Sequence, residues 1–373
     1  MRAVAVSLAL VLLSACGAPP TTTTKTPSPP LSSALPQAVK HSGEIFNSQW
    51  TVTIIARDPT ALLQARTQQH WIKAALVEVE RQLSSWPVAG RPSELSRFNA
   101  AAWTKAVPVT PGLGAVLSTC IDVGQRTDGA FDITLGPLLD VWGFSAASKG
   151  TVTAPPTAEQ IAVARARTGL GLLHVGSGGL QKDREDLVVD VTAVGDGAGA
   201  AAVMKALQER GFRDVLVDVA GEVVASGQGL DKPWQVGVNV PSSAAAPDDI
   251  ERVVALETGT SSAGHPHPGT RALSTSGTYR EALVVGSASE GKRYPHILDP
   301  RTGAPVTHDL VSCTVIANDV VVADALSTAC VALGEEGTRA ILDRFPDAEV
   351  LFIHQKPDLS FASSTTKGFP ASR

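Results

Sequence analysis

Asp324 and Thr328 have the types and the spacing of a cation site. They are four residues apart in a helix expected to begin near Val322, so they share one helical face. A carboxylate and a hydroxyl on one face can both reach a hard cation such as Mg²⁺. Taken by itself, the pair has a simpler explanation, in which Asp324 favours the helix N-terminus and Thr328 bonds to the backbone.

A second candidate is the segment Asp190–Gly197, where an expected strand, Leu187–Val191, gives way to an expected helix, Gly197–Arg210. Free backbone N–H groups at such a junction can bind phosphate, and carbonyl groups of a kinked loop can ligate a cation. The structural alternative is a connecting loop with Asp196 as the helix N-cap. The segment has neither the P-loop pattern nor the dinucleotide-binding fingerprint, so it predicts neither of those sites.

Three further segments combine polar groups with turn residues. Ser274–Arg280 and Tyr294–Gly303 offer hydrogen bonds to phosphate and, in His296, a proton acceptor, although a single histidine near a turn is more often structural. In Thr127–Phe144, Phe131 can face a planar ring while Asp132 bonds its polar edge. Taken alone, this last segment is more often a turn than a site.

The elements that must position these residues indicate an α+β fold, because no strand–helix period repeats along the chain. Alternating apolar residues predict a strand over Gln49–Ala56, and helical spacing predicts one long amphipathic helix from Pro59 to Ser85. Other expected helices are Pro111–Arg126, a stretch within Ala154–Thr168, and the helix that stops at Gly211. The other expected strands are Val215–Val219, a short one near Val223, Gln235–Val240, Arg252–Leu256, Glu281–Val285 and Val311–Ile316.

Composition sets the class of protein. The 373 residues are 43% hydrophobic and 18% charged, which is ample for a sizeable core. The formal net charge is -5 and there is no long basic run, so nucleic acid is excluded as an expected partner. Cys120, Cys313 and Cys330 have no metal-ligand spacing and are expected to be small buried apolar residues.

The amino-terminal residues predict an export signal over residues 1–15. Arg2 precedes the short apolar run Ala3–Leu13, and Leu13-Ser14-Ala15-Cys16 resembles a lipobox, which predicts lipidation at Cys16. The alternative is an ordinary signal peptide with a chance cysteine. Residues 16–40 are rich in Thr, Pro and Ser and predict a disordered tether, followed by a folded domain over 41–373. We therefore expect a bacterial envelope protein, lipid-anchored to a membrane and facing the periplasm or the exterior.

Together and in this order, the segments resemble the ApbE family from about Phe46 to Phe352. The matching signatures are Ser93–Asn99, Gly129–Asp132 continuing to Phe144, Thr275–Arg280, His296–Gly303 and Ala323–Thr328. The resemblance implies an ApbE-like, T-fold-related single body of mixed sheets and helices with an FAD cleft.

It also implies an activity: Mg²⁺-dependent transfer of FMN from FAD to a Ser or Thr hydroxyl of an acceptor protein, with release of AMP. Asp324, Thr328 and the carbonyl of Ala193 would be the metal ligands. Because a neutral imidazole can accept a proton near pH 7, we expect His296 to be the base, with Asp299 as the next choice; the alternative is that His296 holds a phosphate. The residues implied to contact FAD are Phe46, Trp86, Ala130, Phe131, Asp132, Asp190, Asp196, Leu273, Thr275 and Ser276.

The chain also departs from the family pattern. Phe46-Asn47-Ser48 replaces Met-Gly-Thr, Ala220-Gly221-Glu222 replaces Gly-Gly-Asp, Asp196 replaces Lys or Glu, and Ser327 stands where some members have Asp. Two alternatives stay open: hydrolysis of FAD to FMN and AMP, and FAD binding without catalysis. A purely structural envelope lipoprotein fits the combined motifs least.

Overall fold

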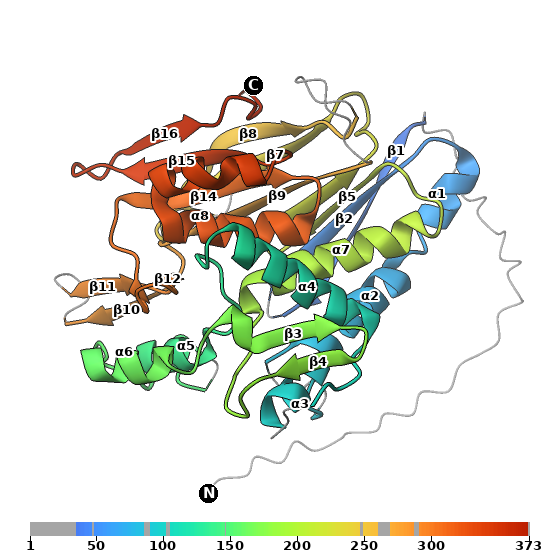
Figure 1. Ribbon diagram of the computed structural model, residues 1–373. Helices are drawn as coiled ribbons and strands as arrows, with labels where there is room; N and C mark the ends of the chain where they lie inside the picture. The colour runs from blue at the N-terminus through green and yellow to red at the C-terminus, as the bar shows by residue number, and fades with distance from the viewer. Residues whose placement is uncertain are drawn as a thin grey trace, which may run out of the picture. The chain divides into compact units, whose positions relative to one another are not determined.

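An eight-stranded antiparallel sheet forms the centre of the folded body in the computed structural model (Figure 1). The structure describes residues 35–371, apart from 47, 86–89, 102–104, 146, 247–248, 260–268 and 287–290. The strand order is β1-β2-β5-β6-β9-β14-β15-β16, and each neighbouring pair is antiparallel. Helices interleave with these strands along the chain, which confirms the predicted α+β class.

The strands of the large sheet are β1 (Gln37–Ile45), β2 (Ser48–Ala56), β5 (Val215–Val219), β6 (Glu222–Ser226), β9 (Thr270–Gly277), β14 (Leu310–Ala317), β15 (Glu349–Gln355) and β16 (Phe361–Thr365). The helices are α1 (Pro59–Ala65), α2 (Gln69–Leu83), α3 (Glu94–Ala100), α4 (Pro111–Arg126), α5 (Gly136–Trp142), α6 (Ala158–Arg165), α7 (Gly195–Gln208) and α8 (Val320–Ile341), with short 3₁₀ turns η1 (Leu170–Leu172), η2 (Thr192–Val194) and η3 (Leu342–Arg344). Among the described residues, four two-stranded sheets lie outside the large sheet: β3–β4 (Leu173–Gly176, Gly179–Lys182), β7–β8 (Trp234–Asn239, Ile250–Leu256), β10–β11 (Ala282–Val285, Lys292–Pro295) and β12–β13 (Leu298–Asp299, Ala304–Pro305).

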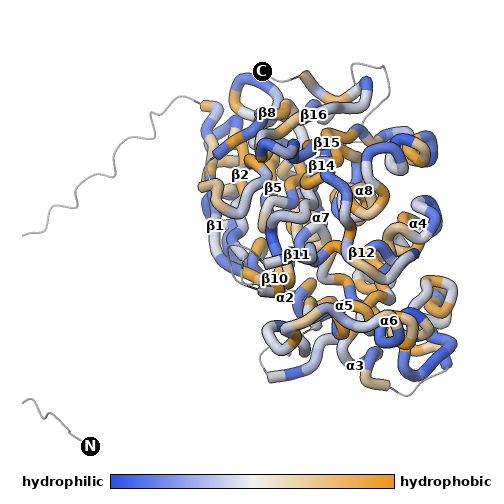
Figure 2. The backbone as a smooth tube through the Cα atoms, turned by 90° about the vertical axis from the view of Figure 1, so that its left-hand side faces the viewer, coloured by the Kyte–Doolittle hydropathy of each residue, from blue (hydrophilic) through white to orange (hydrophobic). Residues whose placement is uncertain are grey.

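Other elements pack on both faces of the large sheet. Because successive side chains of a strand point to opposite faces, alternate residues belong to different cores. Val224 and Ala272 belong to the main core beneath α2, α4, α7 and α8, whereas Val223 and Leu273 belong to a second core beneath the β7–β8 hairpin. Viewed from the side, α7 and α8 lie next to the strands, with α4 on their far side (Figure 2). A polar residue on the α8 face of β6 or β9 is therefore placed between sheet and helices.

A third apolar cluster ties two distant parts of the chain together. Leu138 and Trp142 of α5 pack with Ala164 of α6 and Leu298 of β12. The Trp142 indole Nε1 donates a 2.9 Å hydrogen bond to the carbonyl of Gly303. The segments that end at Phe144 and Gly303 are thus held side by side.

Most predicted elements are confirmed: the helices over 111–126, 158–165 and 195–208, the strands around Gln49, Val215, Val223, Gln235, Arg252, Ala282 and Val311, and the helix that carries Asp324. Cys120, Cys313 and Cys330 are buried, as expected. The large sheet begins at Gln37, so the predicted tether boundary at residue 40 falls inside β1.

Two predicted elements are wrong. The single helix over 59–85 is broken between α1 and α2, because the Ala65 carbonyl accepts a 2.8 Å hydrogen bond from His41 Nε2 and the turn there tightens. Leu187–Val191 is not a strand. Its backbone groups bond elsewhere: Asn99 pairs with both the N–H and the carbonyl of Val189, at 2.9 and 2.7 Å.

Candidate functional site

Asp324 is buried where α8 meets the N-terminus of α7. Asp319 caps α8 by accepting from two backbone N–H groups, which places Asp324 in the second turn, facing the sheet. The Asp324 side chain is 5% exposed, and its Oδ2 accepts a 3.1 Å hydrogen bond from the Gly197 N–H. A Cβ atom on Gly197 would lie 2.7 Å from that oxygen, so this approach requires glycine.

A row of hydroxyl groups lines the sheet side of Asp324. Ser274 Oγ lies 3.4 Å from Asp324 Oδ1 and 3.2 Å from Ser327 Oγ. Ser276 Oγ lies 2.7 Å from Ser327 Oγ and 3.0 Å from Thr328 Oγ1. Strand β9 and helix α8 therefore place Asp324 and Thr328 beside a continuous set of oxygen atoms, as their helical spacing predicts.

The surrounding charge is mainly negative and mostly withdrawn from water. Burial, together with the charges of Glu222 and Asp196, raises the pKa of Asp324 well above its usual value. Burial raises the pKa of Glu222 to about 8, and it raises the pKa of Asp196 to about 6 against the opposing charge of Arg280. The cluster thus favours either bound protons or a bound cation.

The donor atoms fit Mg²⁺, which prefers oxygen ligands. Among the described residues, no group of three or more His, Cys, Asp or Glu side chains is placed to hold one metal ion. Such an ion would instead use the Asp324 carboxylate with the Thr328 hydroxyl and a backbone carbonyl. The carbonyl expected from the resemblance is that of Ala193.

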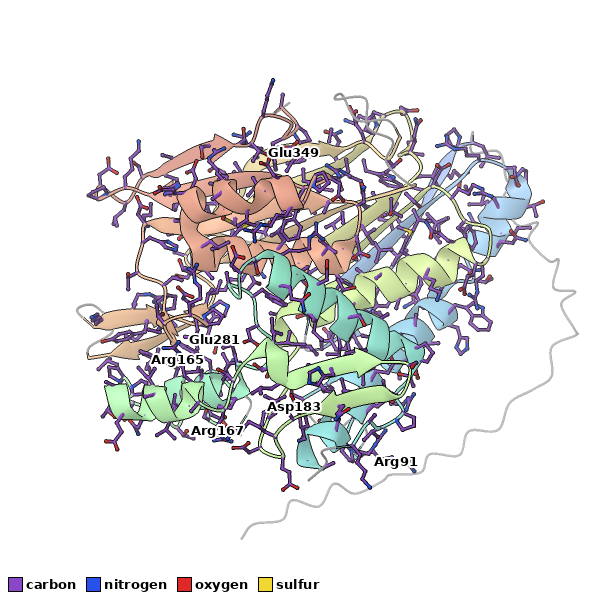
Figure 3. The ribbon with its side chains drawn as sticks, in the orientation of Figure 1. Arg91, Arg165, Arg167, Asp183, Glu281 and Glu349 are labelled. Carbon is purple, nitrogen blue, oxygen red and sulfur yellow. The ribbon has the colours of Figure 1, made fainter. Side chains whose placement is uncertain are left out.

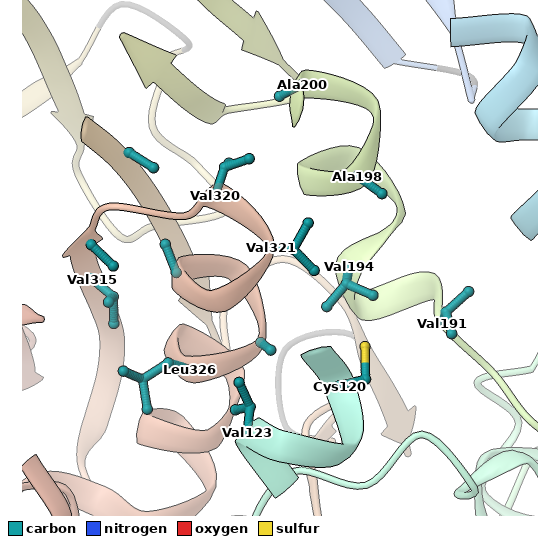
Figure 4. Packing of buried hydrophobic residues seen from close by; sticks show 14 of the residues in the cluster. Cys120, Val123, Val191, Val194, Ala198, Ala200, Val315, Val320, Val321 and Leu326 are labelled. Carbon is teal, nitrogen blue, oxygen red and sulfur yellow. The ribbon is translucent and has the colours of Figure 1, made fainter. Parts of the chain in front are cut away.

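Ala193 lies in η2, directly before α7. Asp190 Oδ1 accepts a 2.8 Å hydrogen bond from the Thr192 N–H and so fixes the start of this turn. η2 packs against α8, and Figure 4 shows Val194 among Cys120 and Val321 at that junction. The Asp190 N–H donates to the Ile133 carbonyl at 2.7 Å, which joins the Asp190–Gly197 segment to the Thr127–Phe144 segment.

His296 lies in the loop between β11 and β12. Its Nδ1 is 3.1 Å from the Glu281 carbonyl, a group that can only accept, so Nδ1 carries the proton and Nε2 is left as an acceptor. Glu281 lies beside the small hairpins, above α6 in Figure 3. Burial lowers the pKa of His296, which keeps the imidazole neutral near pH 7. The Phe144 ring packs edge-on against it, with ring centres 6.4 Å apart.

Asp299, the second candidate base, is already paired. Its carboxylate accepts from Arg301 Nε at 2.8 Å and Nη2 at 3.0 Å, and also from the Arg301 backbone N–H. Both oxygen atoms of this carboxylate are therefore already engaged by the Arg301 guanidinium. The geometry therefore favours His296 over Asp299.

The residues expected to contact FAD are not equally exposed. Ala130 and Phe131 are buried in the main core, and Leu273 is buried in the second core, so FAD contacts there would come from the backbone. Thr275 bonds Thr314 at 2.8 Å, and strand alternation points it away from α8, whereas Ser276 faces α8. Asp132 Oδ1 accepts two bonds from Thr134 and is committed to a local turn.

Three predicted site residues remain: Phe46 and Trp86, expected to contact FAD, and Cys16, expected to be lipidated. Phe46 has a positive φ of 54°, and its ring lies against α7, where Cε2 is 3.2 Å from a Cβ built on Gly199. Trp86 and Cys16 lie outside the described residues.

Sequence reasoning included Ser274 and Arg280 in a candidate segment and noted Glu222 as a departure from the family pattern, but it did not place these three residues beside Asp324. Glu222 and Ser274 face α8 from adjacent strands, and Arg280 interacts electrostatically with Glu222, Asp324 and His296. The alternation in Ala272-Leu273-Ser274-Thr275-Ser276 was the available signal, since it assigns the two serines to one face.

Comparisons with known proteins agree with this geometry. The sequence model of the ApbE family matches residues 46–352. A protein of Klebsiella pneumoniae named FAD:protein FMN transferase is 35% identical over 339 residues, which are 90% of this chain and 87% of that protein. A Salmonella typhimurium protein of the same name is 32% identical, over 92% of this chain and 89% of that protein.

Solved structures show the same architecture. The flavin transferase ApbE from Vibrio cholerae superimposes with a TM-score of 0.72 at 29% identity, covering 90% of this chain and 99% of that one. The apo flavinyl transferase ApbE of Pseudomonas stutzeri gives a TM-score of 0.72 at 28% identity, covering 89% of this chain and 96% of that one.

Proposed function

The chain belongs to the ApbE family and is an FAD:protein FMN transferase, and we propose that the transfer takes place at the Asp324 cluster, onto a Ser or Thr hydroxyl of the acceptor. The observation that carries this proposal is the buried Asp324 carboxylate, which is held between the α7 N-terminus and the hydroxyls of β9. Buried carboxyl groups with a raised pKa cluster at sites that bind a cation or carry out a reaction.

The chain's own residues supply binding, positioning and proton transfer. Asp324, Thr328 and the Ala193 carbonyl would hold Mg²⁺, which supplies charge neutralisation of the diphosphate when bound. Arg280 adds positive charge next to the cluster. His296 accepts the proton of the acceptor hydroxyl at Nε2, because Nδ1 is held by the Glu281 carbonyl. The FMN phosphorus–oxygen bond to the acceptor then forms as the bond to AMP breaks.

The test combines the chain lacking residues 1–34 with FAD, Mg²⁺ and an acceptor domain that carries a Ser or Thr flavinylation motif. Released AMP and the fluorescence of the acceptor band on a denaturing gel are measured together. We expect a fluorescent band that is lost with chelator and with Asp324→Ala. AMP without a band would establish hydrolysis of FAD instead, and bound FAD without either product would establish a flavin-binding protein.

We also propose that Cys16 carries a lipid that anchors the protein to a membrane of the bacterial envelope. The lipobox-like Leu13–Cys16 supports this proposal. In the part of the chain that the structure describes, no helix has the length and apolarity needed to cross a bilayer. Radiolabelled palmitate should label the wild-type chain in bacterial cells and not Cys16→Ser. Equal labelling of the two would refute the anchor.

A further inference from the structure

Glu222 is a buried carboxylate with an unmatched oxygen. Its side chain is 5% exposed, and within the described residues its Oε2 atom has no hydrogen-bond partner. Its carboxylate accepts a hydrogen bond from Ser274. An unpartnered carboxylate oxygen in a protein interior is strongly unfavourable unless a cation or a proton accompanies it.

The sheet register places this oxygen at the Asp324 site. Val223 of β6 pairs with Leu273 of β9, so Glu222 lies opposite Ser274 on the face that α8 covers. The Ser274 hydroxyl also reaches Asp324 Oδ1 at 3.4 Å. One serine therefore contacts both buried carboxylates, and each carboxylate raises the other's free energy in the charged form.

The positive charge of Arg280 does not resolve this repulsion. Arg280 interacts electrostatically with Glu222 and Asp324, but its side chain is exposed and it bonds Tyr279. Its Nη2 lies 3.8 Å from a Cβ built on Gly221, at the edge of the cluster. The interior of the cluster, between the two carboxylates and the hydroxyls, remains negative. A compact cation of charge two matches that interior better than any anion.

We propose that Glu222 is a carboxylate ligand of the divalent cation at the Asp324 site, so that two carboxylates rather than one hold the ion. The inference rests on the proposed cation site and goes beyond its three expected ligands. Two carboxylates and neighbouring hydroxyl oxygens form a donor set typical of Mg²⁺ and Mn²⁺.

Cation binding can be measured without FAD and without turnover. Mn²⁺ is titrated into the metal-free full chain, and free Mn²⁺ is followed by electron paramagnetic resonance for the wild type, Glu222→Gln, Glu222→Asp, Asp324→Ala and Asp218→Asn. Asp218→Asn is the matched control. The Asp218 charge acts on Glu222, but its carboxylate is held by the Gly221 N–H at 2.9 Å, so the control reports electrostatic attraction without ligation.

We expect Glu222→Gln to weaken Mn²⁺ binding by about tenfold or more and Asp218→Asn by less than about threefold, with Glu222→Asp between them. Equal effects of Glu222→Gln and Asp218→Asn would overturn the inference. Wild-type Mn²⁺ affinity in Asp324→Ala would instead overturn the proposed cation site itself.

Folding is checked by the melting temperature of each metal-free variant and its rise on adding Mn²⁺. Because glutamine cannot ionise and nearly keeps the side-chain shape, metal-free Glu222→Gln should melt no lower than the wild type. Its Mn²⁺-induced rise should be smaller. A full Mn²⁺-induced rise in this variant would again contradict ligation by Glu222.

Discussion

Asp324 depends on a close approach between two helices. The Gly197 N–H bonds its carboxylate, and the space beside that oxygen admits no side chain. The α7 N-terminus adds the partial positive charge of its free N–H groups, which favours a carboxylate there. At the scale of single residues, the site is therefore defined as much by a missing Cβ as by the groups that ligate or react.

Gly197→Ala should reduce FMN transfer at least tenfold, because the new methyl group would displace the Asp324 carboxylate. Initial rates of acceptor labelling at several Mg²⁺ concentrations measure the effect. The matched control is Gly195→Ala, in the same helical turn, where a Cβ would meet no atom within 4 Å. If both variants lose activity to the same extent, the loss reflects the helix rather than the approach to Asp324.

His296→Asn should lower the turnover rate by about 10²- to 10⁴-fold, the range of a lost general base. Only neutral imidazole accepts a proton, and burial lowers the pKa of His296, so the wild-type rate should persist to below pH 6.5 before it falls. The variant should lack this acid limb. A wild-type profile that already falls above pH 7 would argue against His296 as the base.

The chain between β4 and η2, residues 183–191, is irregular but has a well-defined course. Lys182 is fully buried, and its Nζ donates to the carbonyls of Asn99, Glu185 and Leu187 at 3.1, 2.8 and 3.4 Å. Asn99 in turn holds Val189. These side chains replace a strand ladder as partners for the backbone, and they fix the approach to Ala193.

Lys182→Met should destabilise the fold by about 2–4 kcal/mol, because three carbonyls would lose a charged donor that is itself buried. The free energy of unfolding from urea titration measures this change. Lys205→Met, on an exposed position of α7, should change it by less than about 0.5 kcal/mol. Similar values for the two variants would mean that the Lys182 hydrogen bonds contribute little.

At the scale of the whole molecule, two carboxyl groups are buried in the interior, where their charged forms are unfavourable. The large sheet and the α7–α8 layer enclose Glu222 and Asp324, whose pKa values burial raises. A carboxyl group with a raised folded pKa binds more protons in the native state than in the unfolded state. Its contribution to stability is therefore fully present below the unfolded pKa, 4.5 for Glu222, and is lost as pH rises through the folded value of about 8.

The metal-free protein should consequently lose about 1–3 kcal/mol of stability between pH 6 and pH 8.5. Chemical denaturation at both pH values, with EDTA and with saturating Mg²⁺, measures the difference. Mg²⁺ should reduce the loss, and Glu222→Gln should reduce it without Mg²⁺. A metal-free protein that is more stable at pH 8.5 than at pH 6 would contradict this account.

The local sequence pattern was enough to predict those features of this protein that depend on residues close together in the sequence. Helical spacing put Asp324 and Thr328 on one face, strand alternation located most of the sheet, and the ordered motifs indicated the family. The break after Ala65 and the irregular course of Leu187–Val191 were missed, because His41 and Asn99 act from distant parts of the chain.

Only the tertiary structure decided how the candidate site is composed. It pairs Asp299 with Arg301, leaves His296 Nε2 as an acceptor, and brings Glu222 and Ser274 to Asp324. The reason is that burial and residues distant in the sequence set the charge and the partners of a polar side chain. Sequence periodicity predicts neither of them. Residue types and spacing determined the candidates, and the packing of α7 and α8 on the sheet selected among them.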